Sequence, residues 1–254
     1  MASSRPDGRA FDALRPVEMI PGFHRMAEGS VLYRAGSTVV LCTASVDEKV
    51  PAWMEGKGKG WITAEYQMHP RSNPVRRESR DGRGKAPSGR TQEIQRLVGR
   101  ALRAAVDLDK LGERQIAIDC DVLEADGGTR TASITGGFVA LTFALSKMSR
   151  AGMLKVPVLR EPVAAVSVGL LDDELALDLV YREDSRADVD LNLVATRSGA
   201  VIEVQGTAEG APVARRAFQR MVDLALTGIE TLTRAQEKVL ATAGVDLSAL
   251  LIHS

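Results

Sequence analysis

The sequence has few cysteines, few aromatic residues and no excess of charge of either sign. Among 254 residues there are two cysteines and 4% aromatic residues, and 33 basic side chains balance 33 acidic ones. Two cysteines exclude a disulfide-rich scaffold, and since Cys42 and Cys120 lie in apolar runs we expect buried thiols. A net charge of zero excludes recruitment of a polyanion by the field of the whole molecule. Any binding of nucleic acid must therefore be local.

Long apolar runs are also absent. The opening segment MASSRPDGRAF lacks the apolar stretch of a signal peptide, and no run approaches the length of a membrane-spanning helix. We therefore expect a cytoplasmic protein that does not associate with membranes. At 254 residues and 44% hydrophobic content, the chain can bury a large core, as one large domain or two small ones.

Alternating apolar and polar residues predict strands in both halves of the chain. The candidate strands are 17–23, 29–36, 37–46, 61–68, 113–126, 161–171, 174–181, 187–199 and 200–210. Helical spacing of apolar residues predicts helices at 91–106, from 129 to about 147, and from about 212 to 241 with a break or thinning at Gly228. Because strands followed by a helix occur twice, we predict an α+β fold built from a duplicated unit, with mixed sheets packed against helices. No linker separates the halves, about 1–150 and 160–245, so we expect one compact domain over 1–254.

The stretch EADGGTRTASITGG, residues 124–137, joins a strand-like run to a nearly all-apolar run. Glycine accommodates strained turns and close approach of the backbone to a ligand. A helix that begins after such a turn offers free amides and the positive end of its dipole to an anion. Together with the Thr129 hydroxyl and the Arg130 guanidinium, Gly128 indicates a phosphate site. The alternative is an ordinary strand-to-helix turn with a capping threonine.

Acidic residues gather in the second half, with eight Asp or Glu against two Arg between 172 and 190. In YREDSRADVDLNL, Asp188, Asp190 and Asn192 share one strand face and Asp184 precedes them by a short turn. Converging carboxylates bind Mg²⁺ or Mn²⁺, or supply a general acid. A solvated strand edge is the alternative. The carboxylates at positions 119 and 121 are expected to have structural roles, such as pairing with arginines.

A basic segment precedes the first helix, with seven Lys or Arg among residues 69–90. Its last residue, Arg90, comes directly before Thr91, which we expect to cap the helix, and can point at the same anion as the glycine turn. The loop arginines, backed by a helix face with Arg96, Arg100 and Arg103, are suited to contact a phosphate backbone without base specificity. Only Trp53, Trp61 and Tyr66 are near enough in the sequence to be candidates for stacking on bases, so we expect base readout through aromatic residues to be limited. The alternative for Arg90 is an ordinary surface arginine, and the alternative for the basic segment is a solvated charged loop.

Together these features describe a phosphate pocket, an acidic site and a basic track, the combination that phosphoryl transfer on nucleic acid requires. Long segments also carry a likeness to a known family: RPDGRAFDALRP, GWITAEYQMHPR, SGRTQEIQRLVGRALRAAVDL, IDCDVLEADGGTRTASITGG and EDSRADVDLNLVATRSGAVIEVQGTAEG. With the spacing between them, they resemble the bacterial ribonuclease PH family over nearly the whole chain.

The resemblance implies a ribosomal-S5-like fold, a hexameric ring of three dimers and a phosphate-dependent tRNA nucleotidyltransferase. Such an enzyme trims the 3′ end of precursor tRNA, degrades other structured RNA including rRNA, uses inorganic phosphate as co-substrate and reversibly releases nucleoside diphosphates. The implied roles are phosphate binding by Arg90, Gly128, Thr129 and Arg130, metal (Mg²⁺) binding or proton donation by Asp184 and Asp190, and tRNA binding by Arg71, Arg76, Arg77 and Arg80.

In one place the chain departs from the pattern of the family. The basic loop has additional prolines and a different arginine spacing. This departure concerns the choice of RNA-contacting arginines and leaves the phosphate site unaffected. The competing interpretations are a non-catalytic RNA-binding subunit, a hydrolytic nuclease, and an enzyme acting on a small phosphorylated molecule.

Overall fold

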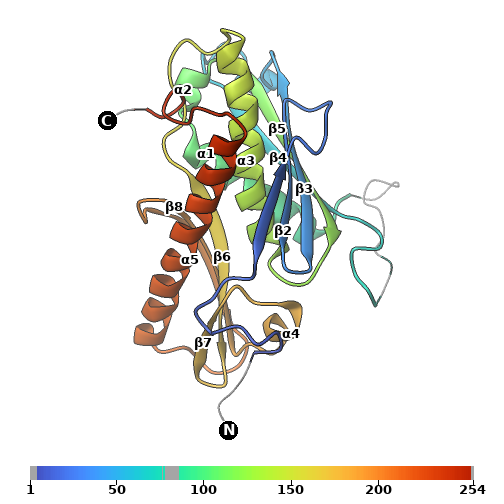
Figure 1. Ribbon diagram of the computed structural model, residues 1–254, viewed down its shortest axis with the longest axis vertical. Helices are drawn as coiled ribbons and strands as arrows, with labels where there is room; N and C mark the ends of the chain where they lie inside the picture. Colours follow the sequence, from blue (N-terminus) through green and yellow to red (C-terminus); the bar gives the residue numbers. More distant parts are fainter. Residues whose placement is uncertain (1–4, 76, 78–85, 253–254) are drawn as a thin grey trace.

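The computed structural model describes residues 5–75, 77 and 86–252, and within them two β-sheets pack against helices (Figure 1). The strands are β1 (Val17–Pro21), β2 (Gly29–Ala35), β3 (Thr38–Asp47), β4 (Trp61–Met68), β5 (Gln115–Glu124), β6 (Val163–Leu171), β7 (Glu174–Leu177), β8 (Val189–Thr196) and β9 (Val201–Ala208). The helices are the 3₁₀ turn η1 (Ala52–Met54), α1 (Gly89–Ala105), α2 (Leu108–Leu111), α3 (Thr129–Arg150), α4 (Tyr181–Asp184) and α5 (Arg215–Thr242). The predicted α+β class is confirmed.

The two sheets differ in strand direction. The first has the order β1-β2-β3-β5-β4, antiparallel except for the parallel pair of β4 and β5, and the second has the antiparallel order β7-β6-β8-β9. The predicted hairpin through Gly36 is present between β2 and β3. Because β4 and β5 are parallel, their carboxyl ends meet at one edge, from which the basic loop and the glycine-rich stretch both leave.

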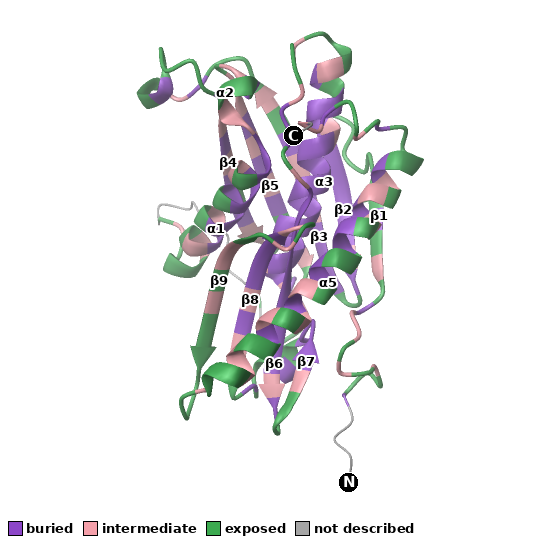
Figure 2. Ribbon diagram, turned by 90° about the vertical axis from the view of Figure 1, so that its left-hand side faces the viewer, coloured by how far each residue is buried: buried purple, intermediate pink, exposed green. Residues whose placement is uncertain are grey.

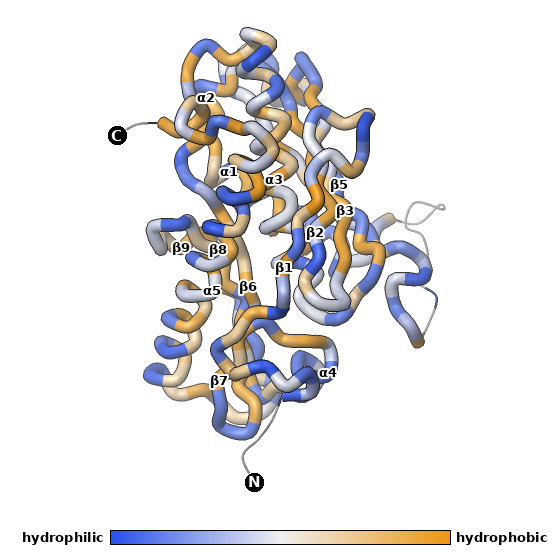
Figure 3. Tube along the Cα trace, in the orientation of Figure 1, coloured by the Kyte–Doolittle hydropathy of each residue, from blue (hydrophilic) through white to orange (hydrophobic). Residues whose placement is uncertain are grey.

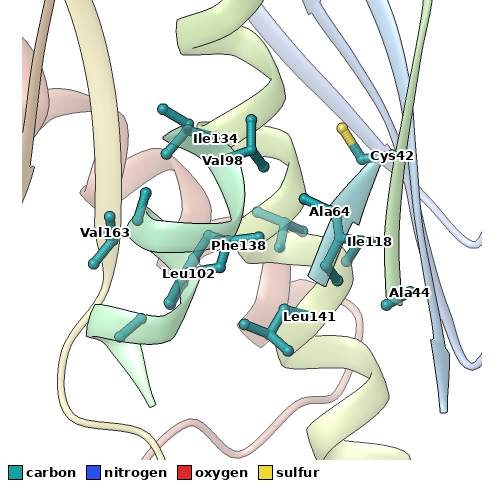
Figure 4. Close-up of a cluster of buried hydrophobic side chains, with 14 of the residues drawn as sticks. Cys42, Ala44, Ala64, Val98, Leu102, Ile118, Ile134, Phe138, Leu141 and Val163 are labelled. Atoms are coloured by element: carbon teal, nitrogen blue, oxygen red, sulfur yellow. The ribbon is translucent and has the colours of Figure 1, made fainter. Parts of the chain in front are cut away.

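Helix α3 forms the centre of the molecule and is apolar on nearly all sides. From Thr131 to Thr142 every residue is buried, as expected for a helix covered from several directions. It packs on β2, β3 and β5 of the first sheet, on α1, and on β6 of the second sheet. Figure 2 shows the buried residues concentrated in α3 and the strands that face it. In Figure 4, Phe138 and Leu141 of α3 lie between α1 and the first sheet.

Helix α5 is amphipathic and covers one face of the second sheet with its apolar side. Hydrophobic and hydrophilic residues alternate along its trace (Figure 3). The predicted break at Gly228 is wrong, because the helix runs through it without interruption. A Cβ at Gly228 would lie 3.0 Å from a methyl carbon of Leu177, so glycine is present for close packing. Buried Gln236 donates to the Thr135 and Val163 carbonyls and thereby joins α5 to α3 and β6.

Two predicted boundaries are also wrong. The strand expected at 174–181 ends at Leu177, because Asp178 adopts a left-handed backbone conformation with φ of 57° and the chain then forms α4. Helix α1 begins at Gly89, since Ser88 and not Thr91 is the N-cap; the Ser88 Oγ accepts the Thr91 amide at 3.1 Å.

One core cluster contains residues from both halves of the chain, among them Phe138 of α3, Val163 of β6 and Leu240 of α5. On this ground we propose, as the sequence predicted, that the halves 1–150 and 160–245 form one compact duplicated unit. Both cysteines are free and buried, as expected. Among the described residues, no helix has the length and apolar character needed to cross a membrane.

Candidate active site

The glycine turn, residues 126–128, connects β5 to α3. Gly127 and Gly128 both lie in the left-handed region, with φ of 77° and 66°, and Gly128 is the N-cap of α3. A residue with a Cβ is strained in this conformation, and a Cβ on Gly128 would lie 2.9 Å from a guanidinium nitrogen of Arg15. The amides of residues 129–131 have no carbonyl partner within the helix, since the first helical bond runs from the Ala132 amide to the Gly128 carbonyl. The turn thus has the form of the anion-binding element that the sequence predicted.

The first two residues of α3 are held by side chains from other elements. The Thr129 hydroxyl is 2.9 Å from the hydroxyl of Tyr66, a buried residue of β4. The Arg130 guanidinium donates to the Gln205 side-chain oxygen of β9 at 2.8 Å and lies 3.6 Å from a Glu93 oxygen of α1. Both predicted phosphate ligands are therefore fixed in direction by their neighbours.

The first turn of α1 places Arg90 near this group while leaving it exposed to solvent. Burial raises the pKa of the Tyr66 hydroxyl, and the Thr129 hydrogen bond and the positive charges of Arg90 and Arg130 act in the opposite direction. Arg90 and Arg130 are therefore electrostatic neighbours of the same hydroxyl pair, from two different helices. The predicted convergence of Arg90 with the glycine turn agrees with this arrangement.

The acidic residues lie on the second sheet and its connection. Asp184 is the last residue of α4, and Asp190 of β8 pairs in register with Thr207 of β9. On β9, Gln205 and Thr207 share the face that carries Asp190, because alternate residues of a strand point to the same side. Arg130 binds Gln205, so the start of α3 lies over the polar face of the second sheet.

The acidic residues and the arginines of the phosphate site influence each other electrostatically. Desolvation raises the pKa of the Asp184 carboxyl, the negative charge of Asp190 raises it further, and Arg130 and Arg90 lower it. Two carboxylates and two guanidinium groups therefore form one electrostatic site, made from elements of both halves of the chain. Asp119 and Asp121, with Glu65, line a groove of about 590 Å³ whose lining also includes Tyr66 and Thr91.

The basic loop begins beside the glycine turn. The His69 amide donates to the Val122 carbonyl, and the Ala125 amide donates to the Ser72 carbonyl at 2.9 Å, so its first residues are hydrogen-bonded to the end of β5. Arg71 and Arg77 are exposed. The predicted RNA contacts at positions 76 and 80 lie outside the described residues.

Two of the three α1 arginines that were expected to support this loop, Arg100 and Arg103, have partners elsewhere. Arg100 forms an ion pair with Glu203 of β9 at 3.2 Å, and Arg103 donates to the Ile62 carbonyl and stacks over the Trp61 ring. Trp53 packs edge-on against Trp61, which begins β4, whereas the basic loop follows the other end of that strand. The tryptophans are therefore displaced from the loop by the length of β4.

Asp184 and Asp190 are suited to hold part of a divalent-cation site. Carboxylate oxygens are the ligands that Mg²⁺ prefers, and Mg²⁺ typically takes one or two of them together with water and substrate phosphate. Within the described part of the chain, no group of three or more His, Cys, Asp or Glu residues has the geometry of a complete metal site. A cation bound to this pair would need its remaining ligands from phosphate and water.

Family models match both halves of the chain. The model of the 3′ exoribonuclease family, domain 1, matches residues 13–145, and the model of domain 2 of the same family matches residues 161–228. The chain belongs to the 3′ exoribonuclease family. The family and the enzyme class predicted from the sequence are thus confirmed.

One relative and two solved structures are also similar to this chain. A protein of Rhodospirillum rubrum named Ribonuclease PH is 53% identical over 238 residues, which cover 94% of this chain and 99% of that protein. Rice (Oryza sativa) Rrp46 matches in fold with a TM-score of 0.75 at 18% identity, covering 93% of this chain and 100% of the other. A chain of the Archaeoglobus fulgidus exosome, solved with RNA bound to its active site, has a TM-score of 0.74 at 24% identity, covering 91% and 92%.

Several residues of the site were not predicted. Tyr66 was considered a stacking partner, whereas its buried hydroxyl bonds to Thr129. Gln205 had no distinguishing sequence signal, because its contact with Arg130 depends on strand pairing. The segment RPDGRAFDALRP did carry a signal, since it contains three arginines close to the start of a strand, but no pattern assigned these arginines to the site.

Proposed function

We propose that this family member is a phosphate-dependent 3′-to-5′ exoribonuclease that trims tRNA precursors and other structured RNA, including rRNA. Inorganic phosphate is its co-substrate, nucleoside diphosphates are its products, and the reaction is reversible. The observation that supports this proposal best is the convergence of Arg90 and Arg130 with Asp184, from elements of both halves of the chain. The relative named Ribonuclease PH, similar over nearly the whole chain, also supports it.

In the proposed reaction, an oxygen of inorganic phosphate attacks the phosphorus of the terminal phosphodiester. A new P–O–P bond forms, the bond to the 3′ oxygen of the preceding nucleotide breaks, and that oxygen takes up a proton. Because attacking and attacked groups are both negatively charged, Arg90, Arg130 and the first amides of α3 lower their repulsion and orient the nucleophile. The Thr129 hydroxyl, held by Tyr66, contributes a further hydrogen bond.

The carboxylates act on the leaving side of the reaction. Asp184 and Asp190 would hold a divalent cation, for which we propose Mg²⁺, and a bound cation would offset negative charge on the scissile phosphate. The alternative role of Asp184 is proton donation: desolvation and the charge of Asp190 raise its pKa, so this carboxyl is protonated more often than an ordinary aspartate and can pass its proton to the 3′ oxygen. The two roles exclude each other in one turnover, because a carboxylate bound to a cation has no proton to donate.

RNA is held outside the phosphate site. Arg71 and Arg77 are exposed in the basic loop, which begins beside the glycine turn, and are proposed to contact the tRNA backbone, as are the arginines at positions 76 and 80. We further propose a cytoplasmic homohexamer arranged as three dimers. Resemblance in fold to chains of an exosome core, a multi-subunit assembly, supports an oligomer.

The alternative of a non-catalytic RNA-binding subunit is disfavoured by the complete set of five side chains, Arg90, Thr129, Arg130, Asp184 and Asp190. A hydrolytic nuclease has no need for the two guanidinium groups beside a helix start. An enzyme acting on a small phosphorylated molecule leaves the arginine-rich loop without a function.

The test uses two exposed arginines of α1. Arg90→Ala removes a cation of the site, whereas Arg96→Ala removes a cation of the same helix that lies outside it. Loss of one charge-assisted hydrogen bond predicts a KM for phosphate raised about 10- to 100-fold in Arg90→Ala. Binding of 3′-extended tRNA, measured without phosphate, should change little, and Arg96→Ala should keep the wild-type phosphate KM. A wild-type phosphate KM in Arg90→Ala would contradict the proposed function.

A further inference from the structure

Arg15 is a buried arginine in the segment before β1, with 4% of its surface exposed. Its Nε and Nη2 donate to the two carboxylate oxygens of Asp178 at 3.0 and 2.6 Å, and its backbone amide donates to the same carboxylate at 2.8 Å. Burial alone would raise the pKa of Asp178, but the hydrogen bonds and charge of Arg15 outweigh it and the pKa is lowered. The buried pair is therefore ionised and held in a single geometry.

The remaining guanidinium nitrogen of Arg15 reaches the glycine turn. Its Nη1 donates to the Asp126 carbonyl at 2.7 Å. Thr38, at the start of β3 and fully buried, completes the contact: its hydroxyl donates to the Gly127 carbonyl at 2.7 Å and accepts the Asp126 amide at 3.0 Å. Three consecutive peptide groups of the turn, from 125–126 to 127–128, are thus hydrogen-bonded to these buried side chains.

The glycine turn also contacts the chain where α4 begins. After Asp178, the chain passes directly against the turn: a Cβ on Gly127 would lie 2.5 Å from the Leu179 carbonyl oxygen. The Asp126 carboxylate accepts the Tyr181 amide at 3.2 Å. Asp184 follows one helical turn later. Arg15 therefore binds both the glycine turn, which precedes the free amides of α3, and Asp178, which begins the connection to α4 and Asp184.

A second buried arginine strengthens this connection. Arg5 donates to both oxygens of Glu183, at 2.8 and 2.7 Å, and to the Leu177 and Asp178 carbonyls. Neither side chain of the Arg5–Glu183 pair is exposed. The N-terminal strap, residues 5–15, thus holds both ends of the connection that leads from β7 to Asp184.

We propose that Arg15, with Thr38 and Asp178, is a positioning unit that sets the distance between the phosphate-binding turn and the carboxylates of the second sheet. This inference rests on the proposed function and extends it to residues that touch neither substrate. In-line attack requires the nucleophile and the leaving group to be aligned closely, and a displacement of about 1 Å can lower the rate about 100-fold. A connection through buried, bidentate hydrogen bonds supplies such rigidity.

Thr38 offers the sharpest test, because valine has nearly the same shape and serine keeps the hydroxyl. In Thr38→Val, the Asp126 amide and the Gly127 carbonyl lose their shared partner. We expect the phosphate KM to rise about 10-fold and kcat to fall about 10-fold as the turn shifts, while tRNA affinity stays within about 2-fold. Thr38→Ser should restore both constants to within about 3-fold of the wild type.

Arg15→Lys is the second variant, in case Thr38→Val does not fold. An ammonium group can pair with Asp178 but cannot reach the Asp126 carbonyl in the same fork geometry, so the same KM and kcat changes are expected. If the folded variants have a lower melting temperature but wild-type phosphate KM and kcat, the network is structural only and the inference is wrong.

Arg90→Ala, assayed in parallel, separates this inference from the proposed function. A raised phosphate KM in Arg90→Ala together with unchanged Thr38→Val and Arg15→Lys overturns the inference alone. An unchanged KM in Arg90→Ala overturns the proposed function itself.

Discussion

Alanine at Gly127 should damage the enzyme in a way that alanine at Gly152 does not. Both glycines have left-handed backbones, with φ of 77° and 70°, so alanine costs about 1–2 kcal/mol at either position. At Gly152 no atom lies within 4 Å of the added Cβ, whereas at Gly127 the Cβ would lie 2.5 Å from the Leu179 oxygen and 2.8 Å from the Tyr181 nitrogen. Because both neighbours are backbone atoms, relief requires movement of the chain that leads to α4, at about 1–3 kcal/mol more.

The total for Gly127→Ala is about 2–5 kcal/mol, against about 1–2 kcal/mol for Gly152→Ala. For a chain of this size, these values predict melting temperatures lower by about 10 °C and about 4 °C respectively. Thermal unfolding followed by circular dichroism measures the difference, and tRNA trimming at a temperature where both variants are folded measures the effect on the site. Equal melting temperatures and equal activities for the two variants would refute the packing of the glycine turn against residues 179–181.

Four further perturbations test the site. Asp184→Asn should lower kcat about 100-fold or more while leaving tRNA affinity within about 2-fold, and loss of stability with normal turnover would make this aspartate structural. Carbon-13 NMR should find the Asp184 carboxyl titrating above 3.8, and Asp190→Asn should move its midpoint down, because a neighbouring negative charge is removed. Since the pKa of Asp178 is depressed, its contribution to stability is present above the unfolded-state value of about 3.9 and is lost as pH falls through the folded-state pKa; the acid loss of stability should be smaller in Asp178→Asn. Tyr66→Phe should raise the phosphate KM about 3- to 10-fold through a freed Thr129 hydroxyl, and an unchanged KM would show that this contact does not orient it.

Local patterns predicted most of the elements and the glycine turn. The alternation in β5 and the spacing of apolar residues in α1 follow directly from burial of one face. The glycines before Thr129 predicted a strained turn followed by the start of a helix, and the structure contains both. The break predicted at Gly228 was wrong. A glycine within a helical pattern indicates a break unless its packing partner, here Leu177, is known.

The remaining parts of the site depend on long-range pairing. The bond from Arg130 to Gln205 spans 75 residues, and the ion pair of Arg15 with Asp178 spans 163. Neither carries a periodic signal, since it arises only when the second sheet packs beside the start of α3. The strand predicted at 174–181 was too long for a related reason: Asp178 turns the chain out of the strand and pairs with buried Arg15, which is distant in the sequence.

The most direct test of the central claim is the origin of the oxygen that replaces the broken bond. Trimming of a 3′-extended tRNA in water enriched in ¹⁸O, with unlabelled phosphate, should give nucleoside diphosphates without the heavy isotope, since phosphate held by Arg90, Thr129 and Arg130 is the attacking group. Nucleoside monophosphates carrying one ¹⁸O atom, formed at the same rate without added phosphate, would contradict the account.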